Sequence, residues 1–172
     1  MTDTEYLEQL MELHTEHLFR IAYYYTKDQR IAEDIVQDVF IKFYHHQKYY
    51  EERGEMKAYL ARMTINKCKD YLKSWAYRKI TFQHNFFAKQ KTVLKNTLIR
   101  QDEQALLDEA ILRLPIKQRE AIVYFYLEEM TIKEIAELLT IPEGTVKSRL
   151  KKGKELLKVD LQHIEWEVLF HG

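Results

Sequence analysis

A cluster of basic side chains near the carboxyl end of the chain is the clearest candidate for a chemical role. Six Lys and Arg residues lie within residues 143–158, against two carboxylates, Glu143 and Glu155. The 172-residue chain has no formal net charge, so the cluster must meet a local requirement. Lys and Arg at this density can neutralise the phosphates of a nucleic acid. A helix face that is merely solvated is the alternative at this point.

A second basic segment lies in the middle of the chain. Residues 54–104 hold eleven Lys and Arg against four Asp and Glu, whereas residues 1–53 are acidic. A neutral protein with two separate basic segments can bind a polyanion through each of them.

The spacing around the first cluster predicts a helix-turn-helix. Thr131 and Glu134 form the pattern of a capping box, which predicts the start of a short helix. A turn follows, with Pro142 suited to the first position of a second helix. The predicted buried side of that second helix comprises Val146, Leu150, Gly153 and Leu157.

The polar side of the second helix is then predicted to point away from the core. An exposed basic helix of this kind fits the major groove of B-DNA. The candidate DNA-binding residues are Thr145, Lys147, Ser148, Arg149, Lys151, Lys152 and Lys154.

Apolar residues at helical spacing predict an all-α fold of two small domains. In the helix predicted to follow residues 26–30, the buried stripe is Ala32, Ile35, Val36, Val39, Phe40 and Phe43. A third helix is predicted over 55–79, and Pro115 should stop another. We expect Leu13 to lie inward in the first helix, and Phe125 and Tyr126 to lie inward after Pro115. The predicted divisions are a first domain (1–80), a linker (81–104), a second domain (105–161) and a tail (162–172). We expect the apolar side chains of the tail to dock on a domain surface, and a partner-binding tail is the alternative.

Several function classes are disfavoured by the composition. Cys68 is the single cysteine, so an internal disulfide framework is excluded and we expect a small core residue. His45 and His46 are adjacent and point to different helix faces, so no metal is predicted. No catalytic triad, carboxylate pair or phosphate loop is present, and we predict neither a cofactor nor an enzyme. No stretch approaches the roughly 20 apolar residues of a membrane span, so we expect a cytosolic protein without membrane insertion.

Three motifs in order resemble bacterial sigma factors of the extracytoplasmic-function group. They are "AEDIVQDVFIKFY" (32–44), "MKAYLARMTINKCKDYLKS" (56–74) and "LPIKQREAIVYFYLEEMTIKEIAELLTIPEGTVKSRLKKGKELLK" (114–158). The resemblance implies a region 2 domain, a region 4 domain and a protein that directs core RNA polymerase to promoters in a stress response. Tyr59 departs from the family, which usually has Trp there, but an aromatic side chain is kept.

The resemblance also assigns roles to residues. The helix over 143–158 would read the −35 element, and segment 56–74 would melt and read the −10 element. Tyr50 would stack on a flipped base, and Asn66 would hydrogen-bond to that base. The alternatives are that Tyr50 only anchors its loop and that Asn66 is a solvent-facing helix residue. The residues implied at the −10 element are Tyr50, Arg62, Asn66, Lys67, Lys69 and Lys73.

The helix over 32–44 would bind the polymerase. Its apolar positions are used by the core, which leaves an outward acidic and polar face suited to a basic partner. The residues of this face are Glu33, Asp34, Gln37 and Asp38. The partners implied are promoter DNA, the β′ clamp helices and the β flap of core RNA polymerase. An anti-sigma factor, which could hold the protein at the membrane, is left open as a further partner.

A stand-alone DNA-binding regulator is the competing hypothesis, because its helix-turn-helix would look much the same. The two hypotheses differ at residues 32–79. A regulator has no need of a polymerase-docking helix followed by a melting segment.

Overall fold

The computed structural model describes residues 1–49, 55–81 and 103–161, and the regular elements within these ranges are helices. The all-α prediction is therefore confirmed. The chain divides into two compact units, Met1–Lys79 and Ile80–Gly172. Tyr50, most of the predicted linker and the predicted tail lie outside the described residues. No helix in the described ranges is long and apolar enough to cross a bilayer.

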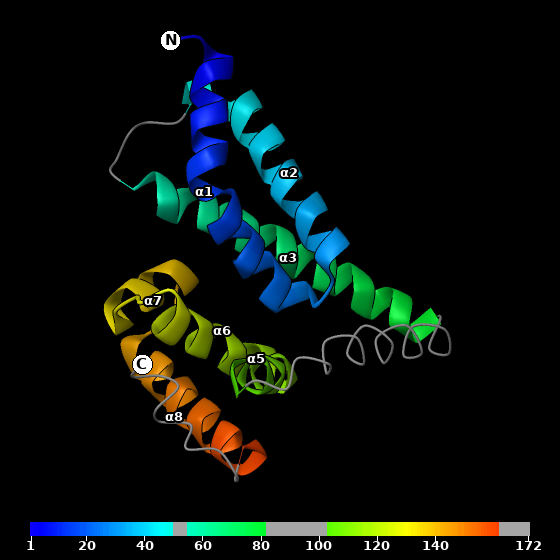
Figure 1. The fold of residues 1–172 in the computed structure, drawn as a ribbon, viewed down its shortest axis with the longest axis vertical. Coiled ribbons are helices and arrows are strands. Elements are labelled where there is room, and N and C mark those ends of the chain that lie inside the picture. The colour runs from blue at the N-terminus through cyan, green and yellow to red at the C-terminus, as the bar shows by residue number, and fades with distance from the viewer. Residues whose placement is uncertain (50–54, 82–102, 162–172) are drawn as a thin grey trace. The chain divides into compact units, whose positions relative to one another are not determined.

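The first unit is built from three long helices (Figure 1). Their bounds are α1 (Asp3–Thr26), α2 (Gln29–His46) and α3 (Met56–Thr81), with a short 3-10 turn, η1 (Gln47–Tyr49), after α2. The turn between α1 and α2 lies where the sequence predicts it. Lys27 closes α1 with φ of 56°. Asp28 then caps α2 by accepting a hydrogen bond from the Ile31 N–H at 3.0 Å.

The core of the first unit lies between α1, α2 and α3. Helices α1 and α2 pack side by side, and α3 crosses them (Figure 1). The Phe43 ring of α2 meets the Tyr59 ring of α3 edge to face, with centroids 6.2 Å apart. All six residues of the predicted α2 stripe are buried, which confirms it.

The placement of Leu13 was predicted wrongly, because this side chain is 74 % exposed. Successive residues of a helix are turned by about 100°. Leu10, Leu18, Ile21 and Tyr25 share one arc of α1, and they are buried. Leu13 falls outside that arc.

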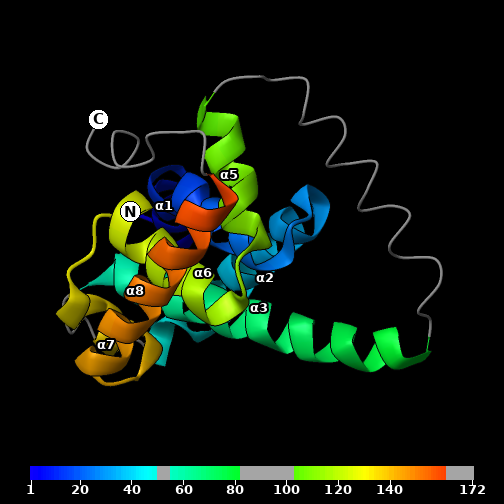
Figure 2. The same ribbon diagram turned by 90° about the horizontal axis from the view of Figure 1, so that it is seen from below.

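The described part of the second unit, residues 103–161, contains five helical segments. Their bounds are α5 (Glu103–Arg113), α6 (Ile116–Ile122), the π-helical segment η2 (Val123–Leu127), α7 (Ile132–Leu139) and α8 (Glu143–Asp160). Pro115 ends the first of these, as predicted, and is also the residue before α6. Helix α8 packs on α6 and α7 (Figure 1, Figure 2).

The π-helical segment changes which residues lie inward after α6. The Glu128 N–H donates to the Val123 carbonyl at 3.0 Å, five residues back, so one turn is wider than an α-helical turn. Tyr124 is only 1 % exposed and occupies the core. Phe125 and Tyr126, predicted to lie inward, are half-buried.

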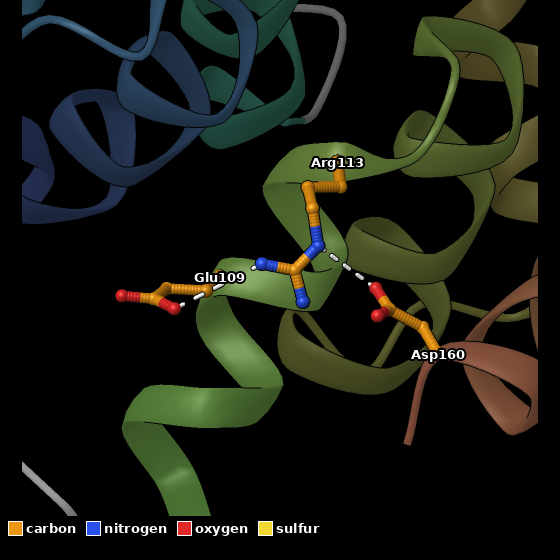
Figure 3. Close-up of polar contacts among 3 residues, drawn as sticks. All are labelled: Glu109, Arg113 and Asp160. Carbon is orange, nitrogen blue, oxygen red and sulfur yellow. Dashed lines mark hydrogen bonds and ion pairs between the residues drawn. The ribbon is translucent and has the colours of Figure 1, made fainter. Parts of the chain in front are cut away.

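A polar bridge joins the end of α5 to the end of α8 (Figure 3). The Arg113 Nε lies 2.9 Å from Oδ2 of Asp160, the last residue of α8. Its Nη1 lies 3.8 Å from Oε2 of Glu109, one turn earlier in α5. Arg113 therefore contacts carboxylates of both helices.

Helices α7 and α8 form the predicted helix-turn-helix. The Thr131 N–H donates to Glu134 Oε2 at 2.8 Å, which is one half of the capping box. The Glu134 N–H donates to Thr131 Oγ1 at 3.1 Å, which completes it. Pro142 precedes α8 and does not occupy its first helical position, one residue away from the prediction. The predicted buried side of α8 is confirmed, since all four of its residues are buried.

Candidate nucleic-acid interface

The outward face of α8 carries most of the predicted DNA-binding side chains. Lys147, Ser148, Lys151 and Lys152 are exposed, and Thr145 and Lys154 are half-buried. The Ser148 hydroxyl donates to the Gly144 carbonyl at 3.0 Å, so its oxygen remains available as an acceptor. The ammonium of Lys154 lies 5.3 Å from the Tyr126 ring centroid. This cation–π geometry holds the Lys154 side chain against η2.

Arg149 does not belong to this outward face, so its predicted exposure was wrong. Its side chain is 17 % exposed, and its Nη1 lies 3.7 Å from Oε2 of Glu120, which is 4 % exposed. Arg149 follows Val146 by three residues and precedes Gly153 by four, so it lies on the packed side of α8. This spacing was visible in the sequence and could have identified it.

A shallow groove of about 410 Å³ runs beside α8. Lys147, Lys151, Lys154 and Lys158 lie along it, and its apolar floor includes Leu150. These lysines are spaced four, three and four residues apart, so they form one stripe about 17 Å long. Duplex DNA carries a phosphate on each strand about every 3.4 Å of its axis, so the stripe can face several phosphates at once.

The α3 side chains predicted to act at the −10 element fall into two groups. Arg62, Asn66, Lys69 and Lys73 share one face of the helix, because they too are spaced four, three and four residues apart. Arg62, Asn66 and Lys73 are exposed, whereas Lys69 is half-buried. Lys67 lies apart from this face and reaches α2, with its Nζ 3.9 Å from Asp38 Oδ2.

The predicted polymerase-binding residues form an exposed surface on α2. Their side chains, those of Glu33, Asp34, Gln37 and Asp38, are all exposed. Two apolar residues extend this surface and were missed in the sequence: Ile41 is 56 % exposed and Tyr44 is 38 % exposed. Ile41 follows Gln37 by four residues and could have been placed there by its spacing alone.

A depression of about 320 Å³ on the first unit gathers several bases. Leu13, His14, His17 and Arg20 of α1 line it, together with Lys57 of α3. Burial lowers the pKa of His14 most, and the neighbouring His17 and Lys57 lower that pKa further. His14 is therefore held towards its neutral form.

Cys68 lies in the core of the first unit, as predicted. It is 0 % exposed, and burial raises the pKa of its thiol to about 12. Such a thiol is not a nucleophile at neutral pH.

Comparison with known proteins gives two matches to domain families, one for each unit. The family model described as "Sigma-70 region 2" matches residues 10–78, and the one described as "Sigma-70, region 4" matches residues 104–157. Together the two segments cover well over half of the chain.

Characterised relatives are similar over nearly their whole length. The chain is 23 % identical to the ECF RNA polymerase sigma factor SigW of Bacillus subtilis, over 94 % of this chain and 92 % of that protein. It is 24 % identical to SigM of the same organism, over 88 % of this chain and 93 % of that protein.

Two solved structures share the fold. The sigma factor RpoE, in a complex with the anti-sigma factor NepR from Bartonella quintana, superposes with a TM-score of 0.66 at 20 % identity, covering 90 % of this chain and 96 % of RpoE. CnrH, in a complex with the cytosolic domain of CnrY, also gives 0.66 at 20 % identity, covering 93 % of this chain and 90 % of CnrH. With both regions matched in order, the chain belongs to the sigma-70 family and is an RNA polymerase sigma factor of the extracytoplasmic-function (ECF) group.

Proposed function

We propose that this sigma factor directs core RNA polymerase to its promoters through three separate surfaces. Helix α8 contacts the −35 element, α3 acts at the −10 element, and α2 binds the polymerase. Membership of the family supports promoter-directed initiation. The observation that carries the proposal is the exposed lysine face of α8 in a capped helix-turn-helix.

The −35 contact follows from the shape and charge of α8. An α-helix fits the major groove, which is about 12 Å wide. Lys147 and Lys151 would neutralise phosphates and so position the helix, whereas Ser148 and Lys152 are exposed and able to reach base edges. Arg149 is not assigned a DNA contact, because its side chain is only 17 % exposed and pairs with Glu120.

The −10 role rests on the exposed face of α3. Opening a duplex requires that an unstacked base gains new stacking and hydrogen-bonding partners. Asn66 is exposed and could bond to such a base, with Arg62 and Lys73 near the phosphates. Tyr50, the proposed stacking partner, stays a prediction from the sequence.

The polymerase contact would use α2. An acidic surface that also exposes Ile41 and Tyr44 suits a basic partner with apolar side chains. We assign this partner as the β′ clamp helices, with the β flap as a second contact elsewhere. Asp38 already pairs with Lys67, so Asp34 and Gln37 are better candidates for the contact.

Regulation by an anti-sigma factor is part of the proposal. RpoE and CnrH, which share this fold, were each solved in a complex with a partner, NepR and the cytosolic domain of CnrY respectively. We infer that a comparable partner holds this protein until a stress releases it, and that a membrane-bound partner would hold it at the membrane. The site of action is the bacterial cytoplasm, at the nucleoid. The protein itself is a transcription regulator, and we propose that it catalyses no reaction of its own.

The test is transcription with reconstituted holoenzyme. The triple variant Lys147→Ala, Lys151→Ala, Lys152→Ala should bind promoter DNA more weakly. Its slope of log affinity against log salt should fall by about 1.8, which is about 0.9 for each of the phosphate contacts of Lys147 and Lys151. Lys117→Ala, an exposed lysine on α6, is the matched control and should leave the slope unchanged. An unchanged slope in the triple variant would remove α8 from the DNA contact.

A second measurement tests whether the exposed face of α2 contacts the polymerase. Asp34→Ala with Gln37→Ala should lower the affinity for core polymerase without changing thermal stability, because both side chains are exposed. If the double variant binds core polymerase as tightly as the wild-type protein does, Asp34 and Gln37 are not part of the polymerase contact.

A further inference from the structure

Helix α8 lies unusually close to α6 at Gly153. A Cβ placed on Gly153 would lie 2.8 Å from Cγ1 and 3.1 Å from Cδ1 of Ile122. The backbone of α8 therefore rests directly on an α6 side chain. Ile122 is fully buried, so it cannot swing out into solvent.

One turn earlier, α8 makes an ionic contact with the same helix. Arg149 precedes Gly153 by four residues, and its Nη1 lies 3.7 Å from Oε2 of Glu120. Glu120 precedes Ile122 by two residues on α6. Both side chains of the pair are largely shielded from solvent, so the contact is maintained only while the two groups stay opposite each other.

Two contacts one turn apart restrict how α8 can move on α6. A shift of α8 along its axis would separate Arg149 from Glu120. A rotation about the axis would do the same and would also force Gly153 off Ile122. The outward residues Lys147, Ser148, Lys151 and Lys152 flank Arg149 on the same two turns, so their directions are set by the same constraint.

We propose that Arg149 is a positioning residue for promoter recognition, which acts through its ion pair with Glu120 and does not touch DNA. The proposal rests on the proposed −35 contact of α8. The pair holds α8 at one rotation, at which the lysine face points outward. Of the basic residues clustered between 143 and 158, Arg149 is the one with its guanidinium against a buried carboxylate.

Glu120 is the residue that allows a decisive test. It is 4 % exposed on α6, so it cannot contact DNA itself. The holoenzyme carries Glu120→Gln, Arg149→Gln or both, and we measure affinity for promoter duplex across a salt series. We also sequence the transcripts made from templates randomised over the −35 element. Circular dichroism at the assay temperature confirms that each variant is folded.

A positioning role predicts a coupled result. Each single variant should weaken promoter binding by on the order of tenfold, equivalent to about 1.4 kcal/mol. The double variant should lose no more than either single variant, and all three should relax the selected −35 sequence. The exchanged pair, Glu120→Arg with Arg149→Glu, should recover part of the affinity, although position 149 then carries a negative charge.

A direct DNA contact predicts a different result. Arg149→Gln would then lower the salt slope by about 0.9, Glu120→Gln would leave promoter binding unchanged, and the exchanged pair would be worse than either single variant. That outcome overturns the positioning role.

Two control variants distinguish a failure of the positioning role of Arg149 from a failure of the proposed −35 contact of α8. Arg113→Gln removes another paired arginine of the same unit, at the far end of α8, and should leave the selected −35 sequence unchanged. Lys147→Ala reports on the −35 contact itself. If Lys147→Ala has no effect, the proposed function of α8 fails; if it weakens binding while Glu120→Gln does not, only the positioning role of Arg149 fails.

Discussion

Replacing Gly153 with alanine is the most direct test of how tightly α8 packs on α6. In an open helix this substitution stabilises, because glycine costs up to about 1 kcal/mol relative to alanine. At position 153 the new methyl group would lie 2.8 Å from Cγ1 of Ile122. Carbon atoms in good contact are about 3.5–4.0 Å apart, so the Ile122 side chain or one of the two helices must move by roughly 0.7 Å or more.

The expected magnitude follows from these opposing effects. Overpacking a well-filled core costs about 1–3 kcal/mol. Subtracting the helix-propensity gain of about 1 kcal/mol leaves a net loss of roughly 0–2 kcal/mol. Gly144 offers a matched control in the same helix, since nothing lies within 4 Å of a Cβ placed there. Gly144→Ala should therefore stabilise by up to about 1 kcal/mol.

Hydrogen exchange in the full chain is the suitable assay, because the two units can unfold separately and a single denaturation curve would mix them. The amides of α6 and α8 should exchange faster in Gly153→Ala and more slowly in Gly144→Ala. A second substitution locates the clash. Ile122→Ala alone should cost about 2–5 kcal/mol, but combined with Gly153→Ala the total should be smaller than the sum, because the new methyl group enters the vacated space.

Hydrogen-exchange protection of α8 in Gly153→Ala, compared with that in Gly144→Ala, decides whether α8 and α6 are in close contact at Gly153. If Gly153→Ala protects α8 as well as Gly144→Ala does, the helices are not in close contact at this point. If the Ile122 and Gly153 substitutions add without coupling, any loss at position 153 has another cause.

Four further substitutions test the effect of burial and of neighbouring charge on two pKa values and the contribution of two helix caps to stability. Burial raises the pKa of the Cys68 thiol to about 12 from its ordinary 9.0. The protonated thiol therefore contributes its full stabilisation below pH 9, and this stabilisation is lost as the pH rises towards 12. The stability difference between wild type and Cys68→Ala should change by up to about 1.4 kcal/mol per pH unit in that window and stay constant below it. The lowered pKa of His14 has the opposite effect, so the first unit should lose stability as the pH falls below 6.5. Because Lys57 repels the protonated ring, NMR titration should show a higher His14 pKa in Lys57→Ala than in the wild-type protein. Thr131→Ala removes one capping box and should cost about 1 kcal/mol in the second unit, whereas Thr2→Ala removes the other and should speed hydrogen exchange only at the start of α1.

Local signals in the sequence predicted much of the fold. The capping box of Thr131 and Glu134 involves residues three apart, so their identities suffice to place the start of α7. The buried stripes of α2 and α8 follow from helical periodicity, and every residue predicted in them is buried. The surfaces of α8, α3 and α2 could be outlined in the same way, because an exposed face is the complement of a buried one.

The errors have two sources, helical spacing that was misjudged and contacts that depend on distant residues or on the exact backbone hydrogen bonding. Arg149 was assigned to the DNA face by its charge, although its spacing from Val146 and Gly153 places it on the packed side of α8. What a single sequence does not show is its partner, because Glu120 lies far earlier in the chain on another helix. The π-helical turn at Val123 depends on which carbonyl receives the Glu128 N–H, which hydrophobic spacing does not encode. Leu13 was grouped with Leu10 and Leu18 as part of the helical spacing of apolar residues, although it lies outside the buried arc of α1.

The bridge between Arg113 and Asp160 closes a loop that contains the whole helix-turn-helix, since the two residues are 47 positions apart (Figure 3). Joining the ends of such a loop costs conformational entropy that grows with the logarithm of its length. A partly exposed ion pair returns only about 0.2–1 kcal/mol, which is too little to close the loop unaided. Burial of Leu107 and Ile111 in α5, and of Leu161 after α8, must supply the rest. The bridge therefore adds only a small stabilisation to helices that apolar packing has already brought together. Concentrated salt should break the ion pair and release the Arg113 side chain, while α5 stays packed in place.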